Sequence, residues 1–224
     1  MSNSKTKGWL WTSDSVQKTS IDALIRFLDE HLKSEHEITL ISKPTLINTL
    51  KSHFMDQNLI NVVDKMSMLT YDCIQTTFQK KVEGTLEKPS LDDLMIIASF
   101  FKGFMKDCFD YDRTMAQMED TARHFISADD FYVWKNQGEI VCMGNIAHRS
   151  ERHVRLNEIY TPPLHRKKGY AGALVNALCK QIIEKGKIPM FYTDKSVQAS
   201  NKAYSNVGFK LKGQVDEIQI SLLE

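Results

Sequence analysis

The stretch N-E-I-Y-T-P-P-L-H-R-K-K-G-Y-A-G, from Asn157 to Gly172, decides the fold. It predicts a strand, then a loop broken by two prolines, then a basic, glycine-containing turn that leads directly into a helix. Apolar residues recur at helical spacing from Ala171 to Ile182, and Gly186 provides a C-terminal stop for this helix. We therefore expect a functional site where the turn meets the helix.

The basic turn is suited to binding an anion. The first backbone N–H groups of a helix have no intrahelical partner, and the helix dipole adds about half a positive charge there. The turn also supplies side-chain donors and small residues that leave room for close approach to the backbone. The donors are Arg166, Lys167 and Lys168, and the small residues are Gly169, Ala171 and Gly172. This combination suits a pyrophosphate better than a lone carboxylate, which implies a phosphate-bearing cofactor.

The turn by itself also has a plainer interpretation. An isolated R-x-x-G-x-A pattern is equally compatible with a solvated basic surface whose glycines only shape a turn. A P-loop is excluded because no G-x-x-x-x-G-K-[ST] occurs, and a dinucleotide fingerprint is excluded because no G-x-G-x-x-G occurs.

A second motif lies downstream and links the turn to a known family. It consists of F-Y-T-D at 191–194, S-N-K-A-Y at 200–204 and V-G-F at 207–209. Residues 160–163 and 166–171 resemble the acyl-CoA pyrophosphate motif of GNAT acetyltransferases. The downstream segments resemble the next strand of that family, its N-x-x-Y helix and its G-F/Y exit. The likeness extends over residues 129–222, and over the two helices between Leu91 and Phe125 by order only.

The resemblance implies a fold and a cosubstrate. The fold is mixed α/β, with a central twisted mixed sheet flanked by helices and a V-shaped opening between two parallel strands. The cosubstrate is acetyl-CoA, with backbone groups of Ile159, Tyr160 and Thr161 pairing with pantetheine. The turn from Arg166 to Gly172, Tyr170 included, would hold the pyrophosphate.

The resemblance also implies catalytic roles. Asn201 and Tyr204 are three residues apart and share a helix face, so Asn201 would bond to pantetheine and Tyr204 would protonate the departing CoA thiolate. Packing in the core is the alternative for Tyr204. Glu158 is the nearest strand carboxylate that could deprotonate an amine, and it could equally be an exposed residue paired with Arg155.

The chain is predicted to have two parts, with residues 1–88 as an α/β extension and residues 89–224 as the GNAT domain. The polar stretch from Lys80 to Pro89 marks the boundary. Ser20 is expected to cap the first helix of the extension, from Ile21 to Leu32. Further strands are expected at 37–41, 66–74, 131–134, 140–145, 154–160, 188–193, 209–211 and 218–222, and further helices at 44–55, 91–105, 115–125, 171–185 and 196–207.

Composition excludes several classes of function. Lys plus Arg (29) nearly balance Asp plus Glu (28), so the chain lacks the positive field that binding to nucleic acid or an anionic membrane requires. The four cysteines form no C-x-x-C pair, and no metal site is expected. No signal peptide or apolar run of about 18 residues is present, which predicts a cytoplasmic protein without membrane contact. Asp194 is interpreted as a helix cap, with orientation of a cationic acceptor as the alternative.

These features together predict an N-acetyltransferase. It would transfer an acetyl group from acetyl-CoA to a primary amine of a small molecule or peptide, by direct attack in a ternary complex. Two alternatives stay open: an acyltransferase with another acyl donor or a hydroxyl acceptor, and a non-catalytic module that binds CoA. The apolar face of the helix from Ile21 to Leu32 must be buried somewhere, which is compatible with a homodimer.

Overall fold

The structure, a computed structural model, describes residues 7–13, 15–57, 59–196 and 204–223 of the 224-residue chain. The chain forms two compact units. The first contains residues 1–70, 192–197 and 212–224, and the second contains residues 71–191 and 198–211. Neither unit is one continuous stretch of sequence, because three strands run from one unit into the other: β3 (Ile60–Asp72), β8 (Ile188–Asp194) and β9 (Lys210–Leu222). The predicted boundary between residues 88 and 89 falls inside the second unit.

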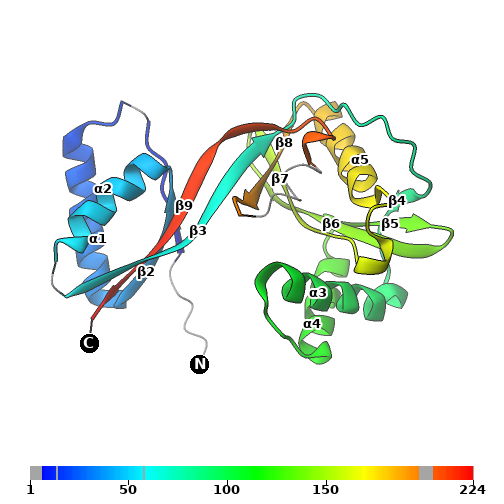
Figure 1. Cartoon of the computed structure of the whole chain (residues 1–224), viewed down its shortest axis with the longest axis horizontal. Helices are drawn as coiled ribbons and strands as arrows, with labels where there is room; N and C mark the ends of the chain where they lie inside the picture. The colour runs from blue at the N-terminus through cyan, green and yellow to red at the C-terminus, as the bar shows by residue number, and fades with distance from the viewer. Residues whose placement is uncertain (1–6, 14, 58, 197–203, 224) are drawn as a thin grey trace. The chain divides into compact units, whose positions relative to one another are not determined.

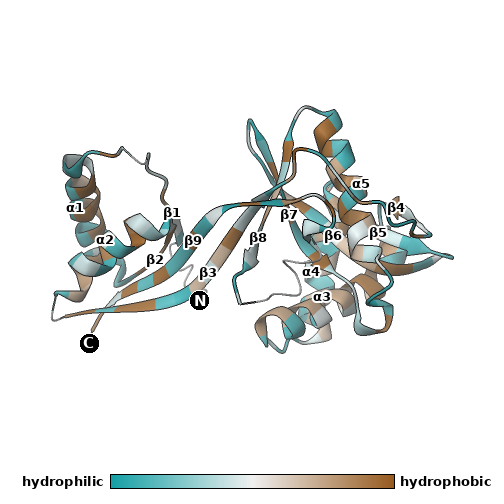
Figure 2. Cartoon of the chain, turned by 45° about the horizontal axis from the view of Figure 1, so that its top comes forward, coloured by the Kyte–Doolittle hydropathy of each residue, from teal (hydrophilic) through white to brown (hydrophobic). Residues whose placement is uncertain are grey.

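The first unit is a small α/β layer. Its elements are β1 (Lys7–Trp9), α1 (Lys18–Glu35), β2 (Glu37–Ser42), α2 (Pro44–Met55) and the larger parts of β3 and β9. The strands follow the order β1-β2-β9-β3, with β1 and β2 parallel and β2 and β9 antiparallel. Leu28 and Leu32 of α1 and Leu50 of α2 pack on Ile38 and Ile218. Hydrophobic and hydrophilic residues alternate along β3 and β9, as a sheet with one covered face requires (Figure 2).

The second unit contains a mixed sheet with helices on both faces. Its elements are β4 (Thr85–Glu87), α3 (Leu94–Phe109), α4 (Met115–Ser127), β5 (Phe131–Asn136), β6 (Glu139–Arg149), β7 (His153–Tyr160), α5 (Tyr170–Glu184) and the first part of β8. The strands follow the order β8-β7-β6-β5-β4, in which only β7 and β8 are parallel. A hairpin turn joins β5 and β6, in which Gln137 and Gly138 both have positive φ (51° and 83°), as in a type I′ turn.

The two faces of this sheet carry different helices (Figure 1). Phe100, Phe101 and Met118 of α3 and α4 pack with Met143 of β6. The neighbouring Gly144 faces the other way, and a Cβ there would lie 2.7 Å from Leu174 of α5. Because successive strand residues point to opposite faces, α5 covers the face opposite to α3 and α4.

Several sequence predictions need correction. Ser20 does not cap α1, which begins at Lys18 with Gln17 as its N-cap and no side-chain bond. The first turn is exposed to water, so its N–H groups need no side-chain acceptor. The two strands expected at the C-terminus are one strand, β9, because the polar residues between them bond to their neighbours; Ser67 Oγ, for example, donates to Asp216 at 2.7 Å. The helix expected at 196–207 lies mostly outside the described residues, and the short strands β1 and β4 were not predicted.

The close packing of α3 on β7 predicts that a methyl group added at Gly103 lowers the stability of the protein. A Cβ added at Gly103 would lie 2.3 Å from the hydroxyl oxygen of Tyr160 and 2.9 Å from Cζ of the same ring. We expect Gly103→Ala to lower the free energy of unfolding in urea by about 1–3 kcal/mol through overpacking, although alanine is favoured over glycine in helices by about 1 kcal/mol. Ser99→Ala, at an exposed position of the same helix, is the control and should change little. Equal or greater stability of Gly103→Ala would contradict this packing.

Candidate active site

The second half of β7 contains a β-bulge. Met143 pairs with Tyr160 and Asn145 pairs with Asn157, so one residue of β6 lies opposite two residues of β7, Glu158 and Ile159. Glu158 has a positive φ of 48°, which is uncommon for a residue other than glycine. The bulge directs Ile159 towards the α5 face, where its Cδ1 lies against Gly144, and leaves Tyr160 on the α3 face.

The pairing between β7 and β8 is short. Their parallel ladder joins residues 153–155 of β7 to residues 188–190 of β8. Beyond Arg155, β6 is the only sheet neighbour that the described residues provide for β7. A strand with one free edge exposes backbone donors and acceptors that an extended ligand can use. This edge includes Ile159 and Tyr160, and Thr161 follows directly.

Glu158 is a partly buried carboxylate held by two amides. Its Oε2 accepts from Nδ2 of Asn145 at 3.0 Å, and its Oε1 accepts from Nδ2 of Asn157 at 2.8 Å. Burial raises the pKa of Glu158 above its usual value, while the bond from Asn145 and the charge of Arg155 oppose the rise. A carboxylate with a raised pKa is better matched to taking up a proton near neutral pH than an exposed one is.

Tyr160 and Arg166 converge on one carboxylate of α3. The Tyr160 hydroxyl donates to Oδ2 of Asp107 at 3.1 Å, and the guanidinium of Arg166 pairs with the same oxygen. Arg166 Nε also donates to the carbonyl oxygen of Thr161 at 2.9 Å. Burial and the bond to Asp107 raise the pKa of Tyr160 to about 12. Arg166 therefore fixes the turn. Asp107 could not be predicted as a site residue from the sequence, because its partners Tyr160 and Arg166 lie more than 50 residues away.

The rest of the basic turn is placed at the start of α5. Gly169 is the N-cap residue with a φ of 98°, and Lys167 and Lys168 are exposed beside it. The first turn of α5 contains no acidic residue. Tyr170 differs from its neighbours because its side chain is buried and its hydroxyl accepts from Nδ2 of Asn136 at 2.8 Å. Only the backbone of Tyr170 is thus available to a ligand.

The room expected beside the small residues of the turn is partly filled. A Cβ at Gly172 would lie 2.6 Å from the ring of Phe78, and a Cβ at Gly169 would lie 3.1 Å from the side chains of Lys80 and Val82. The expectation of open space at these two glycines is therefore wrong on that side. The segment that contains Phe78, Lys80 and Val82 fills this space and lies about 90 residues before the turn. No local sequence pattern connects this segment to the turn.

Tyr204, the first residue of the described stretch 204–223, lies in an aromatic cluster. Its ring centroid is 4.2 Å from that of Phe191 and 6.2 Å from that of Phe209. Burial raises the pKa of Tyr204, and the nearby thiols of Cys142 and Cys108 act in the same direction, so the phenol stays protonated at neutral pH. Asn201 lies outside the described residues, and its shared face with Tyr204 stays a prediction.

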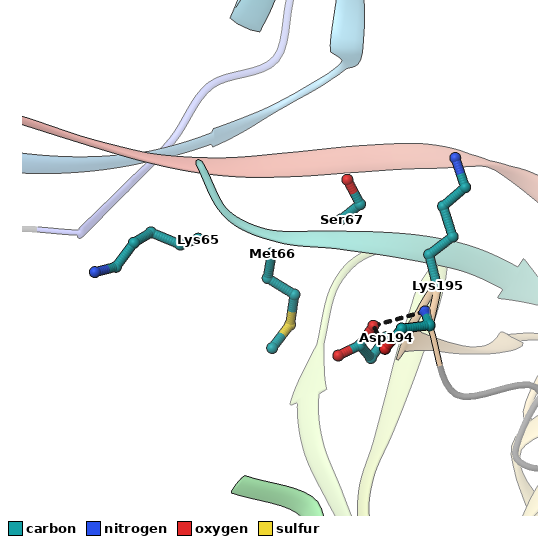
Figure 3. A pocket seen from close by; sticks show the side chains of 6 residues that line it. Lys65, Met66, Ser67, Asp194 and Lys195 are labelled. Atoms are coloured by element: carbon teal, nitrogen blue, oxygen red, sulfur yellow. Dashed lines mark hydrogen bonds between the residues drawn. The ribbon is translucent and has the colours of Figure 1, made fainter. Parts of the chain in front are cut away.

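Asp194 forms a local turn in the first unit. Its Oδ1 accepts from the backbone N of Ser196 at 2.8 Å and from the Ser196 hydroxyl at 2.6 Å. Asp194 also lines an open hollow of about 410 Å³. The side chains of Lys65 and Lys195, which line the same hollow, extend away from the Asp194 carboxylate (Figure 3). This geometry is a local side-chain turn, and the role of Asp194 as a helix cap stays a prediction because residues 197–203 are not described.

Comparison with known proteins decides the family. The sequence profile of the Acetyltransferase (GNAT) family matches residues 97–209, about half of the chain. The chain belongs to the GNAT family. It is therefore an acyltransferase by descent, and its mixed α/β sheet flanked by helices is the GNAT fold. No curated protein sequence matches the chain.

Solved structures of two GNAT proteins and of one functionally unknown protein share this fold. A GNAT acetyltransferase from Colwellia psychrerythraea is 14% identical with a TM-score of 0.62, over 96% of this chain and 78% of that one. A GCN5-related N-acetyltransferase from Kribbella flavida is 12% identical with a TM-score of 0.57, over 91% and 76% of the two chains. A functionally unknown protein from Staphylococcus epidermidis is 9% identical with a TM-score of 0.53, over 96% and 84%. At these identities the likeness concerns the fold alone.

The residues of this GNAT chain fit a CoA-type cosubstrate. The free edge of β7 leads into an exposed basic turn, and Gly169, in the left-handed region, begins a helix without a side-chain cap. These are the features that a pantetheine amide and a pyrophosphate require. Among the described residues, no group of three or more His, Cys, Asp or Glu side chains is arranged to hold a metal ion. None of the described helices is long and apolar enough to cross a membrane.

The amide bond from Asn145 predicts a change in the titration of Glu158. Because this bond favours the charged carboxylate, Asn145→Ala should raise the pKa of Glu158 further above its usual value. A carbon-13 NMR titration of the Glu158 carboxyl measures this pKa. Asn157→Ala is the comparison, and its exposed amide should have the smaller effect. A lower pKa in Asn145→Ala would show that the bond does not act on the charged form.

Proposed function

We propose that the protein is an N-acetyltransferase that transfers an acetyl group from acetyl-CoA to a primary amine of a small molecule or peptide. The observation that carries this proposal is the free edge of β7 that continues into the basic turn and the start of α5. A strand edge and a helix start in succession suit a ligand with amides at one end and phosphates at the other.

The donor would be bound by backbone and charge. Backbone groups of Ile159, Tyr160 and Thr161 would pair with the pantetheine amides. Lys167, Lys168 and the first N–H groups of α5, from Gly169 to Gly172, would hold the pyrophosphate, with Arg166 fixing the turn through Asp107 and Thr161. Asn201 would add a bond to pantetheine.

The proposed reaction requires two proton transfers. Acetyl-CoA supplies an activated thioester when bound. The amine nitrogen forms a bond to the acetyl carbon, the carbon–sulfur bond breaks, and the sulfur leaves as a thiolate. Tyr204 would protonate this thiolate from its neutral phenol, the form that it has at neutral pH. Glu158 would take the proton that the amine loses, a role that its raised pKa favours.

Calorimetric titration with acetyl-CoA tests the donor. We expect saturable binding at one site, and Lys168→Glu should weaken it by about tenfold because a positive charge beside the pyrophosphate is reversed. Lys180→Glu makes the same charge change at an exposed position further along α5 and should leave binding within about twofold. Desulfo-CoA and free adenosine separate the contributions of pantetheine and nucleotide. No binding at millimolar acetyl-CoA would contradict the proposal.

The assignment of Tyr204 predicts a change in turnover alone. Tyr204→Phe should lower turnover by about 10²–10⁴-fold, because the leaving thiolate loses its proton donor, while acetyl-CoA affinity stays within about twofold. Release of free CoA thiol with the best amine from a panel measures turnover. Tyr132→Phe, on β5, is the matched control and should behave as the unmodified protein. Unchanged turnover in Tyr204→Phe would remove this residue from the mechanism.

A further inference from the structure

The segment between β3 and β4, residues 73–84, crosses the second unit and is called the strap here. The end of β3 lies beside β8: Cys73 N donates to the carbonyl oxygen of Pro189 at 2.9 Å, and the rings of Tyr71 and Phe191 stack at 5.1 Å. The strap ends at β4, on the other edge of the sheet. It runs past α5 on the way (Figure 1).

The strap is held by backbone contacts from Cys73 to Thr77 and again at Glu83. Cys73 secures its beginning, and the carbonyl oxygen of Glu83 near its end accepts from Nε1 of Trp134 at 3.0 Å. In between, Thr77 N donates to the carbonyl oxygen of Val207 at 2.8 Å. The side chains of residues 79–81 are exposed. Residues 78–82 are thus the part of the strap that can leave without disturbing β3 or β4.

The length of the strap leaves it slack. The distance from β3 to β4 is five strand spacings, roughly 24 Å at about 4.8 Å per strand. About twelve extended residues reach roughly 40 Å. The strap can therefore move outward from α5 while both of its ends stay in place.

The strap covers the start of α5 on one side. The ring of Phe78 packs on Gly172, and the side chains of Lys80 and Val82 pack on Gly169. Gly169 is the N-cap residue of α5 and Gly172 lies in its first turn. These are the two glycines at which a bound pyrophosphate would come closest to the backbone.

We propose that the strap is an autoinhibitory lid that competes with CoA for the start of α5, and that binding requires Phe78 to leave Gly172. The proposal rests on the proposed function of the turn as a pyrophosphate site. A ligand that binds only the open form has its apparent affinity reduced by the fraction of molecules that are open. The protein would therefore bind CoA more weakly than the turn alone permits.

Loosening the strap should tighten CoA binding. Phe78→Ala removes the contact with Gly172, and we expect the dissociation constant for CoA, measured by calorimetry, to fall by about 3–10-fold. Val82→Ala, which removes the methyl group that contacts Gly169, should lower the dissociation constant as well, by a smaller factor. Phe27→Ala removes an exposed ring of the first unit and is the matched control, with no change expected.

Trypsin provides a readout that is independent of affinity and activity. Lys80 and Lys81 are exposed cleavage sites on the strap, and CoA should speed cleavage there because it holds the strap open. Slower cleavage with CoA, or weaker binding by Phe78→Ala, would overturn the proposal and make the strap part of the binding site. Failure of every variant to bind CoA would instead overturn the proposed function and the competition with it.

Discussion

β7 pairs with β6 along one edge and with β8 along the other, and the two ladders differ in length. The arrangement of the second unit depends on this difference. Along β6, the antiparallel ladder continues to Tyr160, while along β8 the parallel ladder stops at Arg155. The bulge at Glu158 and Ile159 lies in the part of β7 that pairs with β6 but not with β8. Because successive strand residues point to opposite faces, β7 contacts α5 through Ile159 and α3 through Tyr160 beyond the bulge.

Glycines allow both helices to approach this strand closely. Gly103 of α3 lies under the Tyr160 hydroxyl, and Gly144 of β6 makes room for Ile159 and Leu174. The close approach brings Asp107 within hydrogen-bonding distance of Tyr160 and Arg166. The position of the basic turn is thus set by a carboxylate on the opposite face of the sheet, through a bond that would be lost if α3 packed farther away.

The sheet of the second unit is completed by chain from outside the stretch that matches the GNAT profile. The match covers residues 97–209, yet β8 has as its neighbour the end of β3, at Tyr71 and Cys73. A strand at that position has to be connected to β4 at the far edge, and the strap is that connection. The same topology that completes the sheet therefore brings Phe78 to the start of α5.

Features determined by neighbouring residues could be predicted from the sequence. They include the helix Pro44–Met55, the hairpin turn at Gln137 and Gly138, and the turn and helix that begin at Gly169, because caps, turns and periodicity act within a few residues. The linked motifs also led to the family.

Tertiary structure alone decided what depends on contacts far apart in sequence. The full extents of β3 and β9, the bond from Arg166 to Asp107 and the contact of Phe78 with Gly172 each join segments more than 50 residues apart. Such pairs produce no periodic pattern in the local sequence. They are stabilised by the pairing of strands in the sheet and by the packing of helices on its two faces, which depend on the whole chain.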